Sequence, residues 1–422
     1  MWLVLALSYA ISYLHRVAPN VVADQLMESF AVGGAAVLGS LAAMYFYIYV
    51  VMQIPAGLLA DSLGPRATVS IGMLLAAVGS FLFGLAPSLF FAFVGRFLVG
   101  LGVASIFVAI LKFQSVWFKA SEFAFITGMT ILAGNAGAVL ATTPLAMSVN
   151  LFGWQWSFII IGLISLAISL SCWLVVRNAP EGDCSAAAST PLTEKFMQSL
   201  RQTVLVLKNI HSWPPFFVVF GVNGTLIAFS GIWGIPYLMQ VYNLSRSDSA
   251  SLMMMIAIGM IAGSPVMGFL SDRLQRRRLP YIILVFLYAS CWVVMVFWNQ
   301  ARPPLEVLYF LYFFIGFCGA CLTLTYTLAK ELNPPQMSGM AVAVVNIGAF
   351  LGICLLQPLL GYLLDLNWSG VVSEGVKIYS QEAYYYALRF CLYPLALSFF
   401  CALLVKETRG RNCYPADKHI SN

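Results

Sequence analysis

The 422-residue sequence carries little charge. Only 9% of its residues are Asp, Glu, Lys or Arg, whereas an ordinary soluble domain has about 25%. Hydrophobic residues make up 61%, and the mean hydropathy is +0.88. This composition excludes a soluble globular protein. The alternating polar and apolar strands of a membrane β-barrel are also missing, so an all-α polytopic membrane protein is predicted.

Reactive motifs are scarce as well. The sequence has no Gly-x-x-x-x-Gly-Lys-Ser/Thr loop for a nucleotide, and only one histidine, His15, lies in an apolar run. All sixteen Asp and Glu residues fall near the end of an apolar run or in a polar segment. A membrane-embedded enzyme would need clustered reactive side chains and is therefore the weaker alternative. No cofactor, metal or nucleic-acid partner is predicted.

Apolar runs of about 20 residues recur along the chain, and each is long enough to cross the roughly 30 Å hydrocarbon layer as a helix. Twelve spans are predicted, at residues 2–26, 35–60, 67–85, 89–111, 123–148, 154–176, 215–239, 250–270, 280–298, 305–328, 337–363 and 383–405. They predict an N-terminal six-helix bundle over 1–176, a cytoplasmic linker over 177–213, a C-terminal six-helix bundle over 214–405 and a cytoplasmic tail over 406–422. Within the linker, residues 192–210 alternate apolar and basic side chains and are interpreted as an amphipathic helix on the membrane surface.

Lys and Arg are distributed unevenly around these spans. With the amino terminus inside, sixteen of the twenty-two fall in inner segments, and only Arg246, Arg302 and Lys377 fall in outer loops. The positive-inside rule therefore places both termini in the cytoplasm. It also accounts for the net charge of +6 without an acidic partner.

A polar segment repeats at half the chain length. It reads Gly-x-x-x-Asp-x-x-Gly-x-Arg at 57–66 and Gly-x-x-x-Asp-Arg at 268–273, and its two aspartates, Asp61 and Asp272, are 211 residues apart. Each copy is interpreted as a tight inner loop whose Asp and Arg form a contact that opens and closes a gate. A single copy would be equally consistent with a simple polar turn between helices. The presence of two copies at corresponding places favours the gate. The predicted gating residues are Gly57, Asp61, Gly64, Arg66, Gly268, Asp272 and Arg273.

These loops resemble the signature loops of the major facilitator superfamily, after its second and eighth helices. Arg96-x-x-x-Gly100-x-Gly102 is similar to the fourth-helix motif of that family, and Ser62 departs from its usual Arg. The resemblance covers the whole chain. It implies a secondary transporter of two bundles that works by alternating access, with a central cavity lined by helices one, four, seven and ten.

Two further segments resemble the bacterial uptake members of the organic-anion branch. They are Trp117-Phe118 and the stretch Trp-Gly-Ile-Pro-Tyr-Leu at 233–238. This resemblance implies symport of a small organic anion or zwitterion with protons, by a monomer in the lipid bilayer of the bacterial inner membrane. A transporter-like sensor, which binds its solute without moving it, remains open as an alternative.

Three arginines lie inside spans, and one of them, Arg389, is about one turn into the last span, from which its side chain can extend outward. The other two are deeper. Arg16 is roughly 21 Å along the first helix from Trp2, in a polar stripe with Ser8 and Ser12, and Arg96 is roughly 11 Å into the fourth helix. Charge at such depth is costly and indicates a functional site. Because the sequence places no carboxylate at mid-membrane, a carboxylate-bearing solute is predicted, held by guanidinium in bidentate fashion. The alternatives are that Arg16 extends to the outer surface and that Arg96 is structural.

The other candidates carry weaker signals. Histidine has an ordinary pKa near 6.5, which makes His15 the proton-coupling candidate, and a packing role is its alternative. Asn223, Trp233 and Tyr237 on helix seven and Tyr326 on helix ten are the remaining predicted substrate-binding residues. An outer aromatic belt is the alternative for Trp233 and Tyr237. Packing with interhelical hydrogen bonds is the alternative for Tyr326.

Overall fold

The computed structural model describes residues 1–30, 35–118, 120–178, 192–373 and 376–414. These residues are mainly helical. Lipid offers no hydrogen bonds to the backbone, so long apolar segments satisfy their own amides within helices. The chain divides into two compact units, one of Met1–Val32 with Ser40–Gln198 and one of Gly33–Gly39 with Ser199–Asn422.

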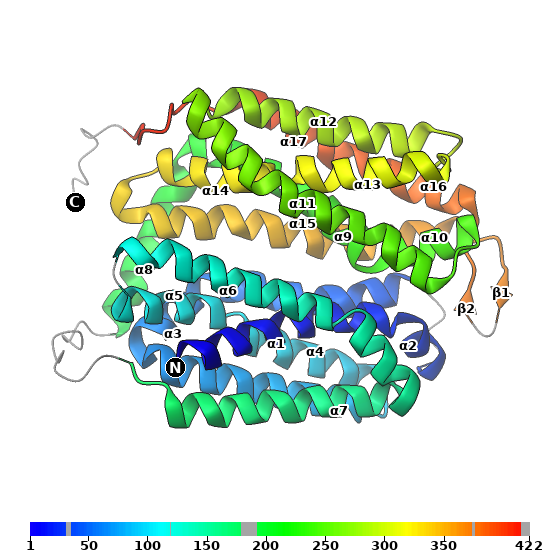
Figure 1. The fold of residues 1–422 in the computed structure, drawn as a ribbon, viewed down its shortest axis with the longest axis horizontal. Coiled ribbons are helices and arrows are strands. Elements are labelled where there is room, and N and C mark those ends of the chain that lie inside the picture. Colours follow the sequence, from blue (N-terminus) through cyan, green and yellow to red (C-terminus); the bar gives the residue numbers. More distant parts are fainter. Residues whose placement is uncertain (31–34, 119, 179–191, 374–375, 415–422) are drawn as a thin grey trace. The chain divides into compact units, whose positions relative to one another are not determined.

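The first unit consists of helices that lie alongside one another (Figure 1). Its helices are α1 (Trp2–Val21), α2 (Ala23–Ser29), most of α3 (Ala35–Gly84), α4 (Leu89–Val103), α5 (Ile106–Trp117), α6 (Ala120–Leu140) and α7 (Thr143–Val175).

The second unit repeats this pattern with more breaks (Figure 1). Its elements are the part of α8 (Leu192–Lys208) from Ser199 on, η2 (Ile210–Ser212), α9 (Trp213–Ala228), η3 (Phe229–Trp233), α10 (Gly234–Tyr242), α11 (Arg246–Leu274), α12 (Arg278–Phe297), α13 (Leu305–Gly319), α14 (Cys321–Glu331), η4 (Pro335–Met337), α15 (Ser338–Leu366), β1 (Val372–Ser373), β2 (Val376–Lys377), α16 (Gln381–Phe390) and α17 (Leu392–Leu404). The two short strands pair antiparallel.

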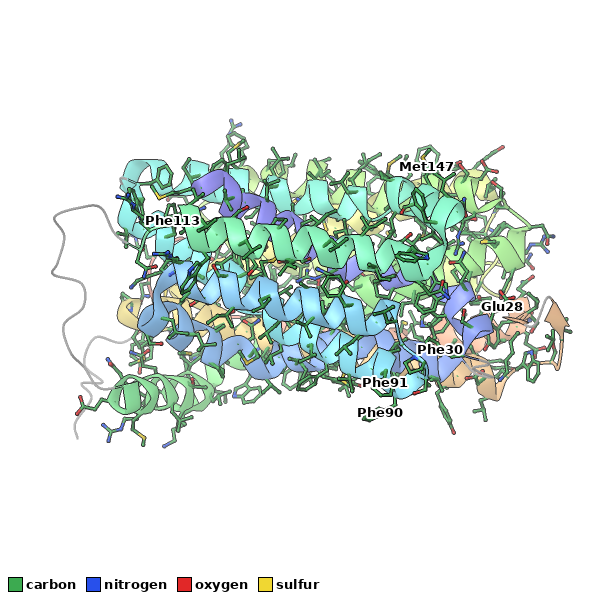
Figure 2. The ribbon with its side chains drawn as sticks, turned by 90° about the horizontal axis from the view of Figure 1, so that it is seen from below. Glu28, Phe30, Phe90, Phe91, Phe113 and Met147 are labelled. Atoms are coloured by element: carbon green, nitrogen blue, oxygen red, sulfur yellow. The ribbon has the colours of Figure 1, made fainter. Side chains whose placement is uncertain are left out.

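The all-α, twelve-span architecture is confirmed. Among the described residues, ten stretches are long and apolar enough to cross a membrane, and α1 and α6 lie at the positions of the other two predicted spans. Many of their apolar side chains face outward. In the stretch of highest hydropathy, Pro144–Val175, only 33% of an 18-residue window is buried. Figure 2 shows Phe90 and Phe91 projecting from the start of α4. Such surfaces suit contact with lipid tails.

Corresponding helices pack alike in the two units. α1, the first span, packs against α6, the fifth, and α9, which begins the seventh span, packs against α15, the eleventh. Gly100 on α4 lies against the carbonyl of Tyr45 on α3, and Gly316 on α13 lies against the carbonyl of Ile256 on α11. Small residues permit this close backbone approach between membrane helices. The half-chain repeat is therefore also a repeat of packing.

The first repeated polar segment is more compact than the tight loop expected from the sequence. α3 continues through it, and the only break in helical geometry is at Gly64, with φ 75° and ψ 166°. The positive φ suits glycine, and a Cβ there would lie 2.6 Å from the Asn178 side chain. Pro65 then starts the next span, since the first position of a helix needs no amide donor.

The seventh span contains a wide turn. Between α9 and α10, residues Phe229–Trp233 form a π-helix, η3. Turns of this kind are rare and often mark functional positions in membrane and soluble helices. The span thereby consists of two α-helical halves joined by one π turn.

Candidate functional site

Arg16 on α1 lies among tyrosine rings. Its guanidinium carbon is 4.5 Å from the ring centroid of Tyr13, 5.8 Å from that of Tyr45 and 5.6 Å from that of Tyr49. The electron-rich face of an aromatic ring attracts a cation at such distances. The Arg16 side chain is partly exposed. The rings thus hold a positive charge in the last turns of α1, and the residue stays partly exposed although its Nε is buried.

The tyrosines were not predicted as site residues. A local signal existed, because Tyr13 precedes Arg16 by three residues and therefore shares its helix face. Tyr45 and Tyr49 are one helical turn apart on α3, so their spacing predicts a common face. Which face meets α1 depends on how α3 is rotated, and the sequence pattern does not specify that.

Arg96 is buried, with 2% of its surface exposed, and it completes the hydrogen bonding of α1. Its Nη1 donates to the backbone carbonyl of His15 at 2.8 Å. In a regular helix that carbonyl would accept from the amide of residue 19, but residue 19 is a proline within α1 and has no N–H. Arg96 therefore supplies the donor that Pro19 lacks, directly beside Arg16.

His15 connects α1 with α7. Its Nε2 lies 2.9 Å from the Ser165 hydroxyl, which donates its own hydrogen to the Ile161 carbonyl at 2.9 Å. Because the hydroxyl has only one hydrogen, Nε2–H is the donor to Ser165. The imidazole is buried, and a proton taken up there would place a second positive charge near Arg96.

The rest of the polar stripe on α1 is satisfied within that helix. The Ser8 hydroxyl donates to the Leu5 carbonyl at 2.6 Å, and the Ser12 hydroxyl donates to the Ser8 carbonyl at 2.7 Å. Both serines are buried. The two serines that precede Arg16 on α1 therefore do not add an accessible polar surface to the site.

The four candidates in the second unit are spread along the seventh and tenth spans. Asn223 Nδ2 donates to the Ala349 carbonyl at 3.4 Å, and Tyr326 Oη donates to Asn346 Oδ1 at 2.8 Å. Both contacts reach α15, and both side chains are partly exposed. These two candidates are thus held in place while remaining accessible.

The other two candidates are buried. Trp233 Nε1 donates to the Gln357 carbonyl at 3.3 Å, and the Tyr237 hydroxyl donates to the Ala301 carbonyl. Each therefore makes a hydrogen bond within its own unit, which suits a packing role.

The arginine of the first repeated segment binds the end of the sixth span. Arg66 Nε donates to the Trp173 carbonyl at 2.7 Å, and its guanidinium carbon is 4.9 Å from the Trp173 ring centroid. Its backbone N–H donates to Asn178 Oδ1 at 2.9 Å. Arg66 thereby ties the break in α3 to the last carbonyls of α7, which have no helical donor.

The second unit contains the equivalent contact. Arg278 Nη2 donates to the Leu403 carbonyl at 2.7 Å, near the end of α17 and of the twelfth span. Arg277 Nε pairs with Glu331 Oε1 at 3.4 Å. The repeat therefore places an arginine on the end of the last helix in each unit.

Glu407 fastens the segment after α17 to the start of α12. Its carboxylate accepts backbone N–H bonds from Arg277, Arg278, Thr408 and Arg409, at 2.8 to 3.2 Å. Burial raises the pKa of this carboxyl, but the four N–H donors outweigh that effect and hold the pKa below its usual value.

The remaining gating candidates are only partly described. The side chains of Asp61 and Asp272 lie outside the described residues, so the predicted pairing of Asp with Arg stays a prediction. Arg273 is exposed. A Cβ added at Gly57 or at Gly268 would meet no atom within 4 Å. Both glycines therefore have open space beside them, which another segment can enter.

The fold and these contacts define a polytopic helical membrane protein made of a repeated six-helix unit. The family model of the Major Facilitator Superfamily matches residues 5–234 and 216–416. The chain belongs to this family.

Curated relatives match along most of the chain. A probable sulfoacetate transporter of Cupriavidus necator is 24% identical over 393 residues, with 87% of each chain covered. A probable L-galactonate transporter of Escherichia coli is 22% identical over 387 residues, covering 87% of this chain and 83% of the relative. The membrane sensor protein UhpC of Escherichia coli is 23% identical over 379 residues, covering 86% and 85%.

A solved structure has the same fold. It is a bacterial homologue of the human lysosomal transporter Spinster, with a TM-score of 0.72 and 20% identity, covering 95% of this chain and 96% of that one. The family match and the relatives named as transporters show that the chain is a multi-pass membrane protein of the transporter class and not an enzyme.

Proposed function

We propose that the chain is a secondary active transporter of small organic anions, with Arg16 binding the anionic group. Two of the relatives named above are probable transporters of sulfoacetate and of L-galactonate, and both solutes bear an acidic group. We further propose that the protein is a monomer in the bacterial inner membrane and that both of its termini lie in the cytoplasm. The family assignment supports alternating access as the way the solute crosses.

The observation that carries this proposal is the arrangement of rings around Arg16. Cation–π contacts act through the aromatic face, whereas a carboxylate binds the N–H edge of a guanidinium. Both interactions can therefore operate together. A partly exposed arginine held by Tyr13, Tyr45 and Tyr49 is prepositioned for an anion, which lowers the entropy lost on binding.

A binding cycle of two solutes and two proteins tests the role of Arg16. The best binder from a panel that includes sulfoacetate and galactonate is compared with its neutral amide, on wild type and on Arg16→Ala. A charge-assisted hydrogen bond contributes about 1.5–3 kcal/mol, so the anion should bind Arg16→Ala roughly ten- to a hundredfold more weakly. The amide should bind wild type poorly and lose little more.

Arg16→Lys sharpens the test. It keeps the charge but lacks the planar fork, so it should recover only part of the affinity. Equal losses for the anion and the amide would mean that Arg16 maintains the fold and does not bind the solute. Solute counterflow in proteoliposomes distinguishes transport from the sensing function of the UhpC relative, because a sensor binds without counterflow.

Proton symport is the proposed driving mechanism. A membrane potential that is negative inside opposes anion entry by about 2.3 kcal/mol per charge for each 100 mV. A co-transported cation would offset this cost, and the sequence contains no nucleotide loop of the Gly-x-x-x-x-Gly-Lys-Ser/Thr type that would supply energy from a nucleotide. His15, a buried histidine within α1, is the candidate proton carrier.

His15→Gln tests that assignment, since glutamine retains an N–H donor for Ser165. If His15 carries the proton, uptake driven by a pH gradient should fall at least tenfold while counterflow, which needs no net proton movement, persists. Equal rates of gradient-driven uptake in the variant and wild type would assign His15 a packing role.

A further inference from the structure

The described side chains of helix α8 form one face that is covered by the protein and another that is exposed. Val206 is buried against Ala341 and Val344 of α15. One turn earlier, the buried Thr203 donates its hydroxyl to the Met340 sulfur at 3.2 Å. These contacts fix the rotation of α8 about its own axis. Side chains on its other faces therefore have defined directions.

An apolar stripe remains exposed next to the covered face. Met197, Leu200, Val204 and Leu207 are all exposed. They are spaced by three, four and three residues, so at 3.6 residues per turn they lie within about 80° of one another. They form one continuous stripe along the helix. We name this set of four side chains the α8 stripe.

Basic residues border the α8 stripe. Arg201 and Lys208 are exposed, and helical spacing places both on the edge away from the face packed on α15. The helix contains three basic residues and one acidic residue, Glu194. An apolar stripe edged with positive charge matches the interface of a bilayer that contains anionic lipid.

The end of α8 is tied to the start of a membrane span. The span Ile210–Tyr242 begins two residues after α8 ends. The Trp213 indole donates to the Leu207 carbonyl at 2.9 Å, and Asn209 Nδ2 donates to the Leu332 carbonyl at 2.8 Å. Trp213 and Ile210 are exposed, and tryptophan favours the level of the lipid headgroups. These contacts hold α8 at the depth where the membrane surface begins.

We propose that the α8 stripe docks on the surface of the lipid bilayer, with Arg201 and Lys208 binding the headgroups of anionic phospholipids. The apolar side chains enter the boundary between headgroups and acyl chains, while the long basic side chains reach the phosphates. Docking anchors the segment that joins the two halves of the sequence to the membrane plane.

Amide hydrogen exchange on the full-length protein tests the proposal. The protein is placed in nanodiscs of phosphatidylcholine alone or with one quarter phosphatidylglycerol, and exchange of peptides covering 197–208 is measured. Each basic residue near an anionic surface adds about 1 kcal/mol, or about fivefold in binding. Exchange in wild type should therefore be up to about 25-fold slower in the anionic discs. Arg201→Gln with Lys208→Gln should abolish the difference between the two lipids.

Leu200 and Leu205 provide a matched pair for the apolar contact. Both are leucines with 41% exposure, but five residues of helix separate their directions by about 140°. Leu200→Gln should speed exchange in both lipids by at least threefold, and Leu205→Gln should leave it unchanged. Replacing Lys330 and Arg411 by Gln removes the same charge elsewhere and should preserve the lipid effect.

Three results would overturn the proposal. Equal wild-type exchange in the two lipids would exclude binding of anionic headgroups. Equal effects of Leu200→Gln and Leu205→Gln would show that the α8 stripe is not the docked face. Protection that rises with protein concentration in detergent, where no bilayer exists, would assign the stripe to a second copy of the chain. Unchanged thermal unfolding and solute affinity would show that each variant is folded.

Discussion

Arg16 and Arg96 lie on neighbouring helices of the first unit, and their surroundings differ. Tyrosine rings contact Arg16 and leave it partly exposed. Arg96 is buried and donates to a carbonyl that a proline has left without its helical donor. Arginine at position 16 is therefore placed to bind a solute, whereas arginine at position 96 supplies a hydrogen bond that helix α1 lacks.

Arg96 and Pro19 should be energetically coupled. Arg96→Met keeps an apolar side chain but removes the donor to the His15 carbonyl, so it should lower the free energy of unfolding by about 1–3 kcal/mol. In a Pro19→Ala background the new backbone amide can supply that bond, and the cost should fall. Thermal unfolding in detergent of the four proteins measures the coupling, expected to be about 0.5 kcal/mol or more.

Pro265→Ala is the control for that cycle. It removes a proline inside α11 of the second unit, away from Arg96, and should not reduce the cost of Arg96→Met. If Arg96→Met costs the same in the wild-type and the Pro19→Ala backgrounds, then Arg96 stabilises the unit by another contact.

At the scale of elements, the segment after α17 is fastened by carboxylates. Glu407 accepts four backbone N–H bonds, and Glu331 on α14 pairs with Arg277 and accepts the Thr408 hydroxyl. Together they connect α12, α14 and the chain beyond α17. Residues 407–409 thus form part of the packing of the second unit.

The depressed pKa of Glu407 makes this fastening pH-dependent. A carboxyl with a lower pKa in the folded state than its unfolded value, near 4.3, adds stability that is complete above that value and is lost as the pH falls through the folded pKa. Glu407→Gln should therefore lower the Tm at pH 7. The difference in Tm from wild type should shrink at about pH 3.5. A difference that stays constant between these pH values would contradict the role of the ionised carboxylate.

The helices could be predicted from the sequence where the lipid environment requires them. Features that depend on how side chains pack were harder to predict. Long apolar runs had to be helices, so the span positions followed. The turn at 57–66 was expected to be a loop, but helix α3 needs only Gly64 to change direction. The rings of Tyr45 and Tyr49 reach Arg16 because α3 has a particular rotation, supported by the approach of Gly100 to the Tyr45 carbonyl. Pairings of that kind depend on tertiary contacts.

At the scale of the whole molecule, the half-chain repeat predicts equivalent roles for Asp61 and Asp272. Asp61→Asn and Asp272→Asn should each slow solute transport at least tenfold while changing solute affinity less than threefold, because each removes a gate charge and leaves the solute site intact. Transport in proteoliposomes and equilibrium binding measure the two properties separately. Asp248→Asn, in the first turn of α11, is the control and should change neither. Lost binding with unchanged transport would contradict the gate assignment.

The π turn η3 in the seventh span has a consequence for how this chain tolerates changes in length. A π turn holds about one residue more than an α turn, so deleting one residue there, such as Gly231, would restore a regular helix. α10 would keep its direction relative to α9, because the turn would lose only the residue by which it exceeds an α turn. Tyr237 would then keep its contact with the Ala301 carbonyl. The seventh span should therefore tolerate a single-residue deletion at this turn, whereas the same deletion within α9 would rotate every side chain beyond it by about 100°.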